Sequence, residues 1–236
     1  MDAVELAARN TAVFWARVAQ ARGYAVARGD GWAAVTGDAR MGRRVVTVGE
    51  ADPAAVRELA VRPGRVAVED AFGGVDLGAE GFTSRQLPVM IRYPGAPVGE
   101  PRVPVRRVAA GEDLRTAERL VVEGFDLVHF QPYEPGVVFP DALLEDTEVY
   151  LAHLDGAPAG ACLAVPQDEV VGVYWVTSMP EFRSRGVGRS LMHALLRRFD
   201  DRPMVLTASR AGRPLYESLA FATVADANWW TPRVAD

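Results

Sequence analysis

The chain has 236 residues, of which 49% are hydrophobic and 24% are charged, and its formal net charge is −5 at pH 7. These values are typical of a globular protein of one large domain or two small ones. They disfavour a nucleic-acid-binding protein, which usually has a basic balance. The single cysteine, Cys162, excludes an internal disulfide.

The sequence shows no segment that would target or anchor the chain in a membrane. No apolar run approaches the roughly 20 residues of a membrane-spanning helix. The first residues lack the basic and then apolar pattern of a signal peptide. We therefore expect a cytoplasmic protein that does not bind membranes.

The first 95 residues alternate helices and short strands. Apolar residues at helical spacing predict a helix over 2–21, and Pro53 in a first turn predicts another over 53–59. The strands that we expect here cover residues 24–28, 32–36, 44–48, 65–69 and 87–92. A proline-rich stretch from Pro94 to Pro104 follows and indicates a linker or an edge segment. This pattern predicts a first α/β domain over 1–95, a linker over 96–102 and a second domain over 103–236.

The second domain also mixes strands and helices. Acidic residues suit the first turn of a helix that begins near residue 112, and Gly124 is its predicted end. A loop-rich region over 125–140 follows, and further helices are predicted from residue 187 and over 212–219. The expected strands cover 103–108, 147–154, 159–165, 169–177, 205–208, 221–224 and 229–231. This order predicts an α/β (α+β) fold in which a mixed sheet carries helices on its faces.

One strand-turn-helix segment carries the clearest chemical signal. Gly186 and Gly188 stand where the helix begins, and glycines there let a ligand approach the backbone closely. The N–H groups of a first helical turn and the helix dipole form an anion site that suits a pyrophosphate. Three arginines add positive charge at the same end, which opposes the dipole unless an anion is bound. They are Arg183, Arg185 and Arg189.

Other interpretations of this segment remain. A dinucleotide-binding fingerprint needs a third glycine at position 191, which is a leucine, and a P-loop needs Gly-Lys-Ser/Thr. Neither pattern fits. A helix start softened by glycine, with solvated arginines around it, is the remaining alternative.

The pattern Arg183-x-x-Gly186-x-Gly188 resembles the signature with which the GNAT superfamily of N-acetyltransferases holds the pyrophosphate of coenzyme A. The resemblance implies a mostly antiparallel sheet and acetyl-CoA as the acyl donor, without a metal. It also implies that the backbone of 184–189 binds the pyrophosphate and that the preceding strand end pairs with the pantetheine arm. The coenzyme-binding residues implied are Val176, Thr177, Ser178, Arg183, Ser184, Arg185, Gly186, Val187, Gly188, Arg189 and Ser209.

A later segment resembles the next block of the same family. Leu215-Tyr216 and Phe221 match, whereas Ser209 replaces a common asparagine and Ala220 a common glycine. Serine can still hydrogen-bond the coenzyme, with a shorter reach. Alanine at 220 would be strained if that turn requires a positive φ. By the resemblance Tyr216 is the catalytic acid that protonates the departing thiolate; the alternative is a packing tyrosine.

The general base is not identified from the sequence. A carboxylate or a histidine would suit the loss of a proton from the attacking amine. The candidates are Glu123, His129, Glu134 and Glu169. Residues 128–136 occupy the region that usually forms the acceptor wall in this family, and an ordinary packed surface loop is the alternative.

These observations predict an N-acetyltransferase of the acyltransferase class that acts by direct attack of a primary amine in a ternary complex. The alternative is a non-catalytic acyl-CoA-binding regulatory module. We expect a small-molecule amine as partner, no nucleic acid, and a monomer or homodimer. The first 95 residues resemble a degenerate copy of the same fold without the glycine signature, and an unrelated α/β cap is the alternative there.

Overall fold

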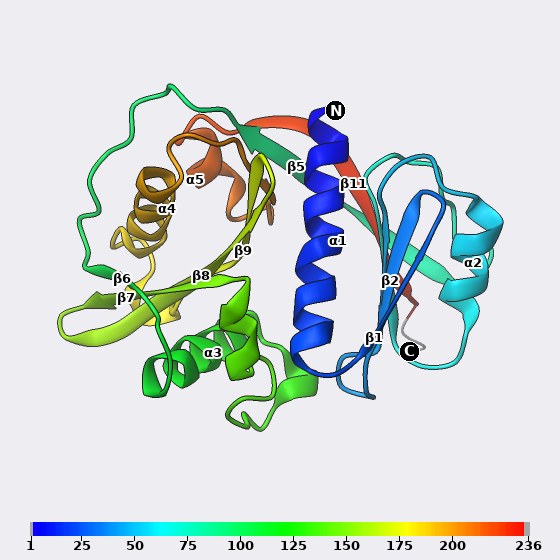
Figure 1. The fold of residues 1–236 in the computed structure, drawn as a ribbon, viewed down its shortest axis with the longest axis horizontal. Helices are drawn as coiled ribbons and strands as arrows, with labels where there is room; N and C mark the ends of the chain where they lie inside the picture. Colours follow the sequence, from blue (N-terminus) through cyan, green and yellow to red (C-terminus); the bar gives the residue numbers. More distant parts are fainter. Residues whose placement is uncertain (1, 234–236) are drawn as a thin grey trace. The chain divides into compact units, whose positions relative to one another are not determined.

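The computed structural model describes residues 2–233. The chain forms two compact units (Figure 1). The central unit comprises Arg92–Met204, and the terminal unit comprises Met1–Ile91 together with Val205–Asp236. The domain boundaries predicted from the sequence, with a linker at 96–102, stay a prediction.

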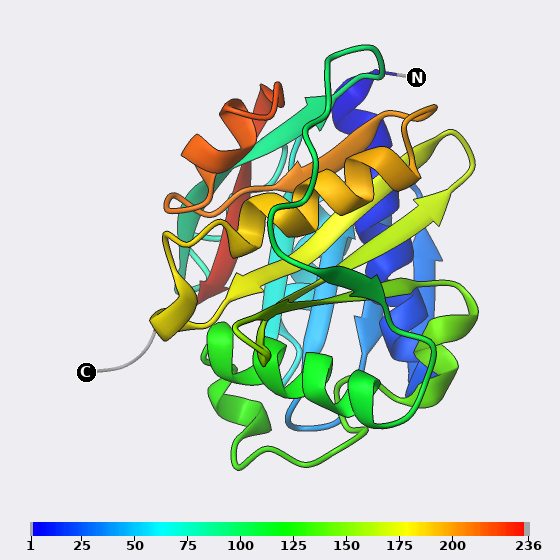
Figure 2. The same ribbon diagram turned by 90° about the vertical axis from the view of Figure 1, so that its left-hand side faces the viewer.

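The central unit contains an antiparallel sheet with a helix on each face (Figure 2). Its helices are α3 (Glu112–Gly124) and α4 (Val187–Arg198). Its strands, in spatial order, are β6 (Val105–Arg107), β7 (Glu148–Leu154), β8 (Ala157–Gln167) and β9 (Val170–Ser178). Neighbouring strands in this series are all antiparallel.

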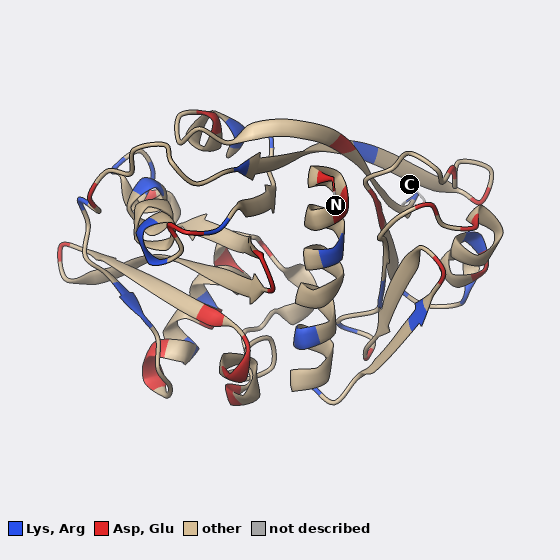
Figure 3. Cartoon of the chain, turned by 45° about the horizontal axis from the view of Figure 1, so that its top comes forward, with Lys and Arg blue, Asp and Glu red and all other residues tan. Residues whose placement is uncertain are grey.

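Local sequence explains how the helices of the central unit begin and end. Acidic residues, which are red in Figure 3, occupy the first turn of α3, where the helix dipole favours them. The helix ends at Gly124, as predicted.

Three short 3₁₀ helices connect the other elements: η1 (Val128–Phe130), η2 (Asp141–Glu145) and η3 (Pro180–Phe182). Cys162 is fully buried on β8.

Residues 93–104, which include the predicted linker, form an ordered strap along α4 (Figure 2). The Ser190 hydroxyl oxygen accepts the N–H groups of Arg102 and Val103, both at 3.1 Å. His193 Nδ1 lies 3.1 Å from the Glu100 carbonyl oxygen, and Arg197 pairs with the Glu100 carboxylate at 3.0 Å. Contacts three and seven residues apart follow one side of the helix, so the strap is fixed along two turns of α4.

The terminal unit contains the mixed part of the fold. Its helices are α1 (Ala3–Ala21), α2 (Pro53–Val61) and α5 (Arg213–Glu217). Its strands, in spatial order, are β1 (Ala25–Gly29), β2 (Trp32–Thr36), β3 (Arg43–Thr47), β4 (Val66–Asp70), β11 (Ala222–Pro232), β5 (Phe82–Arg92) and β10 (Met204–Thr207). β3 and β4 are parallel, whereas β1 to β3 are antiparallel and β11 is antiparallel to both its neighbours.

The C-terminal strand corrects one prediction. Residues 221–224 and 229–231 were expected as two closing strands, but they belong to one strand, β11, which has an irregularity between Thr223 and Ala225. β11 lies between β4 and β5, so it completes a sheet built mainly from the first 92 residues. The predicted α/β fold, with a mostly antiparallel sheet flanked by helices, is confirmed.

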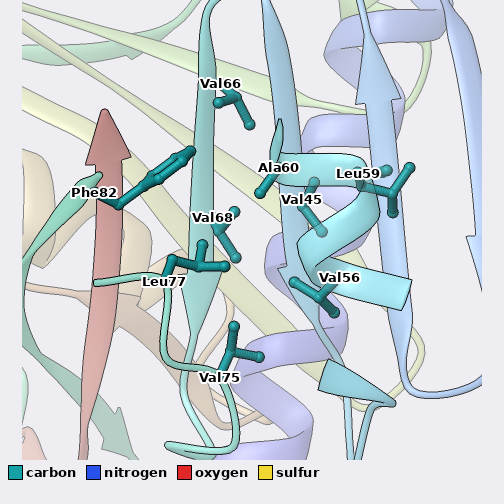
Figure 4. Close-up of a cluster of buried hydrophobic side chains, with 10 residues drawn as sticks. Val45, Val56, Leu59, Ala60, Val66, Val68, Val75, Leu77 and Phe82 are labelled. Carbon is teal, nitrogen blue, oxygen red and sulfur yellow. The ribbon is translucent and has the colours of Figure 1, made fainter. Parts of the chain in front are cut away.

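Side chains from α2, the sheet and the segment before β5 form the core on one face of the terminal unit (Figure 4). Its members are Ala34, Val45, Val56, Leu59, Ala60, Val66, Val68, Val75, Leu77 and Phe82. Trp230 packs against this core. Val66 and Val68 alternate with residues that face the other side, as the twofold period of a strand requires.

Charged and aromatic side chains gather outside that core. The Arg44 guanidinium lies 4.2 Å from the Trp15 ring centre and 5.1 Å from that of Trp229. Trp15 Nε1 donates to the Glu69 carboxylate at 2.9 Å. Burial raises the pKa of Glu69, and the Arg44 charge opposes that rise. The cluster joins α1 to β3, β4 and β11.

No helix within residues 2–233 has both the length and the hydropathy to cross a membrane.

Candidate functional site

The turn between β9 and α4 has the backbone conformation of an anion site. Gly186 precedes the helix with φ 86° and ψ 3°, and no side chain caps it. Ser184, two residues earlier, also has a positive φ of 60°. The first helical hydrogen bond runs from the Ser190 N–H to the Gly186 carbonyl at 2.9 Å. The N–H groups of Val187 and Gly188 precede this bond, at a helix start whose N–H groups commonly bind anions.

The three arginines of this turn have different surroundings. Arg183 Nε donates to the Ser178 carbonyl oxygen at 3.4 Å, and its side chain is exposed. Arg185 pairs with Asp155 of the β7–β8 turn at 2.6 Å, and its guanidinium lies 5.9 Å from the Phe182 ring centre. Arg189 lies in the first turn of α4 and is half-buried. The charge of Arg185 is thus partly neutralised by an exposed carboxylate, which the sequence pattern did not indicate.

The end of β9 carries a bulge. Ala161 of β8 pairs with Thr177, but Leu163 pairs with Tyr174, so Trp175 and Val176 stand opposite one residue. Trp175 has φ 50°, a left-handed conformation that is uncommon for a bulky residue. A bulge places backbone groups outside the regular ladder and redirects the strand. The predicted pantetheine-binding residues 176–178 lie at or directly after this bulge.

Close packing holds the bulged strand end to the elements around it. A methyl group added at Gly160 would lie 2.4 Å from the Thr177 carbonyl oxygen and 2.7 Å from Val187 Cγ1. One added at Gly124 would lie 2.1 Å from Thr177 Oγ1. Glycine at both positions therefore permits α3 and α4 to approach the end of β9.

The loop after α3 is organised by a carboxylate that the sequence analysis missed. Glu118 is fully buried, and it accepts hydrogen bonds from three backbone N–H groups of the loop. A charged residue in a helix is usually exposed, so only its position on the apolar side of α3, beside Leu114 and Val121, could have indicated burial. The aromatic stack of Phe139 on Trp175 was also missed, because it joins residues distant in the sequence.

The remaining predicted site residues belong to the terminal unit. Tyr216 lies on α5, is 8% exposed and packs edge-on against Phe221 with ring centres 5.9 Å apart. The Ser209 hydroxyl oxygen accepts the Gly212 N–H at 3.1 Å, which stabilises the turn before α5. Ala220 has φ 62°, so the turn does use the conformation in which alanine is strained.

The candidate bases differ in where they stand in the central unit. Glu169 lies in the turn before β9, at the opposite end of that strand from the glycine turn. At about 3.3 Å per residue, the six residues from Glu169 to Trp175 span roughly 20 Å, so Glu169 does not reach the bulge. Glu123, His129 and Glu134 follow or end α3 and have exposed side chains. Within residues 2–233, no three His, Cys, Asp or Glu side chains gather as a metal site.

Comparisons with known proteins find one matching family model and several similar solved structures. The acetyltransferase (GNAT) family model matches residues 114–221. A search of curated proteins found no match.

Solved structures extend the likeness to nearly the whole chain. A GCN5-related N-acetyltransferase from Kribbella flavida is 17% identical, with 97% of this chain and 96% of that chain covered at a TM-score of 0.63. A GCN5-related N-acetyltransferase from Sphaerobacter thermophilus is 15% identical, with coverages of 85% and 76% at a TM-score of 0.57. At these identities the likeness shows a shared fold.

Proposed function

Because the chain carries a domain of the acetyltransferase (GNAT) family at residues 114–221, we propose that it transfers an acetyl group from acetyl-CoA to a primary amine. The family and the fold support an acyltransferase. The donor, the acceptor and the residue roles below are parts of the proposal. We propose a small-molecule amine as the acceptor and the cytoplasm as the location.

The glycine turn before α4 is the observation that carries the proposal. Its left-handed Gly186, its uncapped helix start and the neighbouring arginines supply N–H donors and positive charge at one place. A pyrophosphate suits this site, because the anion would accept the N–H groups and complement the helix dipole. The pantetheine arm would then extend along the end of β9, towards the bulge at Trp175 and Val176.

The proposed reaction is direct attack. The neutral amine nitrogen bonds to the thioester carbonyl carbon, the C–S bond then breaks, and the amine loses one proton. That proton passes to a base, for which Glu123, His129 and Glu134 remain candidates, directly or through water. The departing thiolate takes a proton from the Tyr216 hydroxyl. The fully buried thiol of Cys162, whose pKa burial raises, is unsuited to a covalent acyl-enzyme route.

We propose that the first 95 residues are a degenerate copy of the same fold that does not bind coenzyme A. Its elements are one helix, three antiparallel strands, a second helix and a further strand, and they follow in the same order as α3, β7, β8, β9, α4 and β10. Its second helix, α2, begins at Pro53 and is capped by the Asp52 carboxylate, which accepts the Ala54 N–H at 2.9 Å. A carboxylate of the protein thus already occupies the helix start and would repel a pyrophosphate.

Gly188→Glu tests the proposed coenzyme site. Glutamate in the first turn of α4 is favoured by the helix dipole and has a higher helix propensity than glycine, so the fold should be retained. Its charge would repel the pyrophosphate, and we expect coenzyme A to bind at least about tenfold more weakly in calorimetric titration. Wild type should bind one coenzyme per chain.

Gly74→Glu is the matched control, because it adds the same charge at an exposed glycine of the terminal unit with open space around it. Its coenzyme affinity should equal that of wild type. Equal affinity in Gly188→Glu would remove the pyrophosphate site from this turn. Coenzyme binding without acetyl transfer to any amine would favour the non-catalytic module.

A further inference from the structure

A buried carboxylate on α3 controls the loop that follows this helix. Glu118 Oε1 accepts the N–H groups of Val138 at 2.7 Å and Phe139 at 3.0 Å. Its Oε2 accepts the N–H of Gly136 at 2.7 Å and lies 3.1 Å from the Tyr133 hydroxyl. Four donors from residues 133–139 therefore converge on one carboxylate that is fully removed from solvent. Such a charge is stable only when its hydrogen bonds are complete.

Arg115, one turn before Glu118, holds the same loop from the other side. Its Nη1 lies 3.3 Å from Glu118 Oε2, and its Nη2 donates to the Phe139 carbonyl oxygen at 2.6 Å and to Asp141 at 2.9 Å. The N–H of Phe139 is thus bound by the carboxylate and its carbonyl by the guanidinium. Both backbone groups of this one residue are fixed by α3.

The fixed residue contacts the bulge in β9. Phe139 is fully buried, and its ring stacks on the Trp175 ring with centres 5.5 Å apart and planes 20° from parallel. Trp175 is the bulge residue with the left-handed backbone. Two residues later, Thr177 contacts Gly124 at the end of α3. One helix therefore restrains residues on both sides of Val176.

We propose that Glu118 is a positioning residue for the reaction: it fixes Phe139, and Phe139 holds the bulge at Trp175 and Val176 in the geometry that receives the acyl thioester. This inference rests on the proposed function, which places the thioester beside this strand end. Loss of the carboxylate would loosen the loop and the bulge while leaving the glycine turn before α4 intact. Acetyl transfer should therefore suffer far more than coenzyme binding.

Glu118→Gln tests this role with little change in volume. The amide oxygen can still accept two N–H groups, but the amide nitrogen would face other donors. We expect kcat to fall by about tenfold or more, since small misplacements near the reacting atoms have effects of that size. The coenzyme Kd should stay within about twofold of wild type, because the pyrophosphate turn is unaltered. Amide hydrogen exchange should speed up in residues 133–139 and 174–178.

Two further variants separate positioning from stability. Phe139→Leu keeps an apolar side chain but removes the stacked ring, and it should show the same loss of kcat with coenzyme affinity retained. Asp70→Asn is the matched control, because Asp70 is also fully buried and also accepts three backbone N–H groups and a hydroxyl, but in the terminal unit. It should lower stability without the loss of kcat.

A kcat in Glu118→Gln and Phe139→Leu no lower than in Asp70→Asn would overturn the positioning role. If wild type transfers no acetyl group to any amine, the proposed function fails, and hydrogen exchange then decides the structural part. Unchanged exchange at 174–178 in Glu118→Gln would show that Glu118 does not control the bulge.

Discussion

Ala220 has a backbone conformation that glycine would adopt with less strain. Its φ of 62° lies in the left-handed region, where a Cβ atom crowds the following carbonyl at a cost of about 1–2 kcal/mol. We predict that Ala220→Gly raises the free energy of unfolding by about 1 kcal/mol, measured by urea denaturation. Ala222→Gly, in the adjacent strand, should instead lower it, because glycine is unfavourable inside strands. A loss of stability in Ala220→Gly would contradict the strain.

Three buried or half-buried side chains of the central unit, one thiol and two tyrosine hydroxyls, predict a loss of stability at alkaline pH. Burial raises the pKa of the Cys162 thiol, and burial with Glu148 raises the pKa of Tyr150. Burial and the nearby Glu118 raise the pKa of Tyr133 to about 12. Because the unfolded chain releases these protons first, the free energy of unfolding should fall from about pH 8.5 upward, where an exposed thiol titrates.

Urea denaturation between pH 7 and pH 10.5 measures this effect. Cys162→Ala should flatten the fall between about pH 8.5 and 9.5, the range below the normal titration of tyrosine. The same variant keeps both tyrosines, so the fall in stability that remains in it, which should begin nearer pH 10, reports their titration. Stability that is constant or rises across this range would show that the thiol is not buried as described.

The strap of residues 93–104 is the element whose role is most easily tested. Ser190 is 1% exposed and supplies the acceptor for two strap N–H groups. We predict that Ser190→Ala costs about 1–3 kcal/mol of stability, because those donors lose their partner. Ser218→Ala removes an exposed hydroxyl whose bond is local, and it should have little effect. Equal urea midpoints for both variants would contradict a fixed strap.

Local sequence signals were sufficient to predict several elements. The acids in the first turn of α3, Gly124 at its end and Gly186 before α4 are signals that act within a few residues, and the structure agrees with them. The insertion of β11 between β4 and β5 could not be predicted, because it depends on pairing between distant segments. The bulge at Trp175 was missed for a related reason: it shows only in the pairing register between β8 and β9.

At the scale of the molecule, the proposed coenzyme residues divide between the two units. The glycine turn and the bulge belong to the central unit, whereas Ser209 and Tyr216 belong to the terminal unit. The sequence signature at Gly186 indicated the resemblance to the GNAT superfamily, because such an anion site depends on local backbone geometry. It did not identify Glu118, whose importance depends on burial and on four donors from a loop.

The most direct measurement of the central claim is the amine-dependent release of coenzyme A thiol from acetyl-CoA, followed across a panel of small amines. We predict that wild type releases thiol with at least one amine. Tyr216→Phe should lose at least about tenfold in kcat with little change in coenzyme Kd, as expected for loss of a general acid. Tyr93→Phe, at an exposed position of the strap, should match wild type. No amine-dependent release by the wild-type protein would contradict the acetyltransferase, and unchanged turnover in Tyr216→Phe would remove that residue from the mechanism.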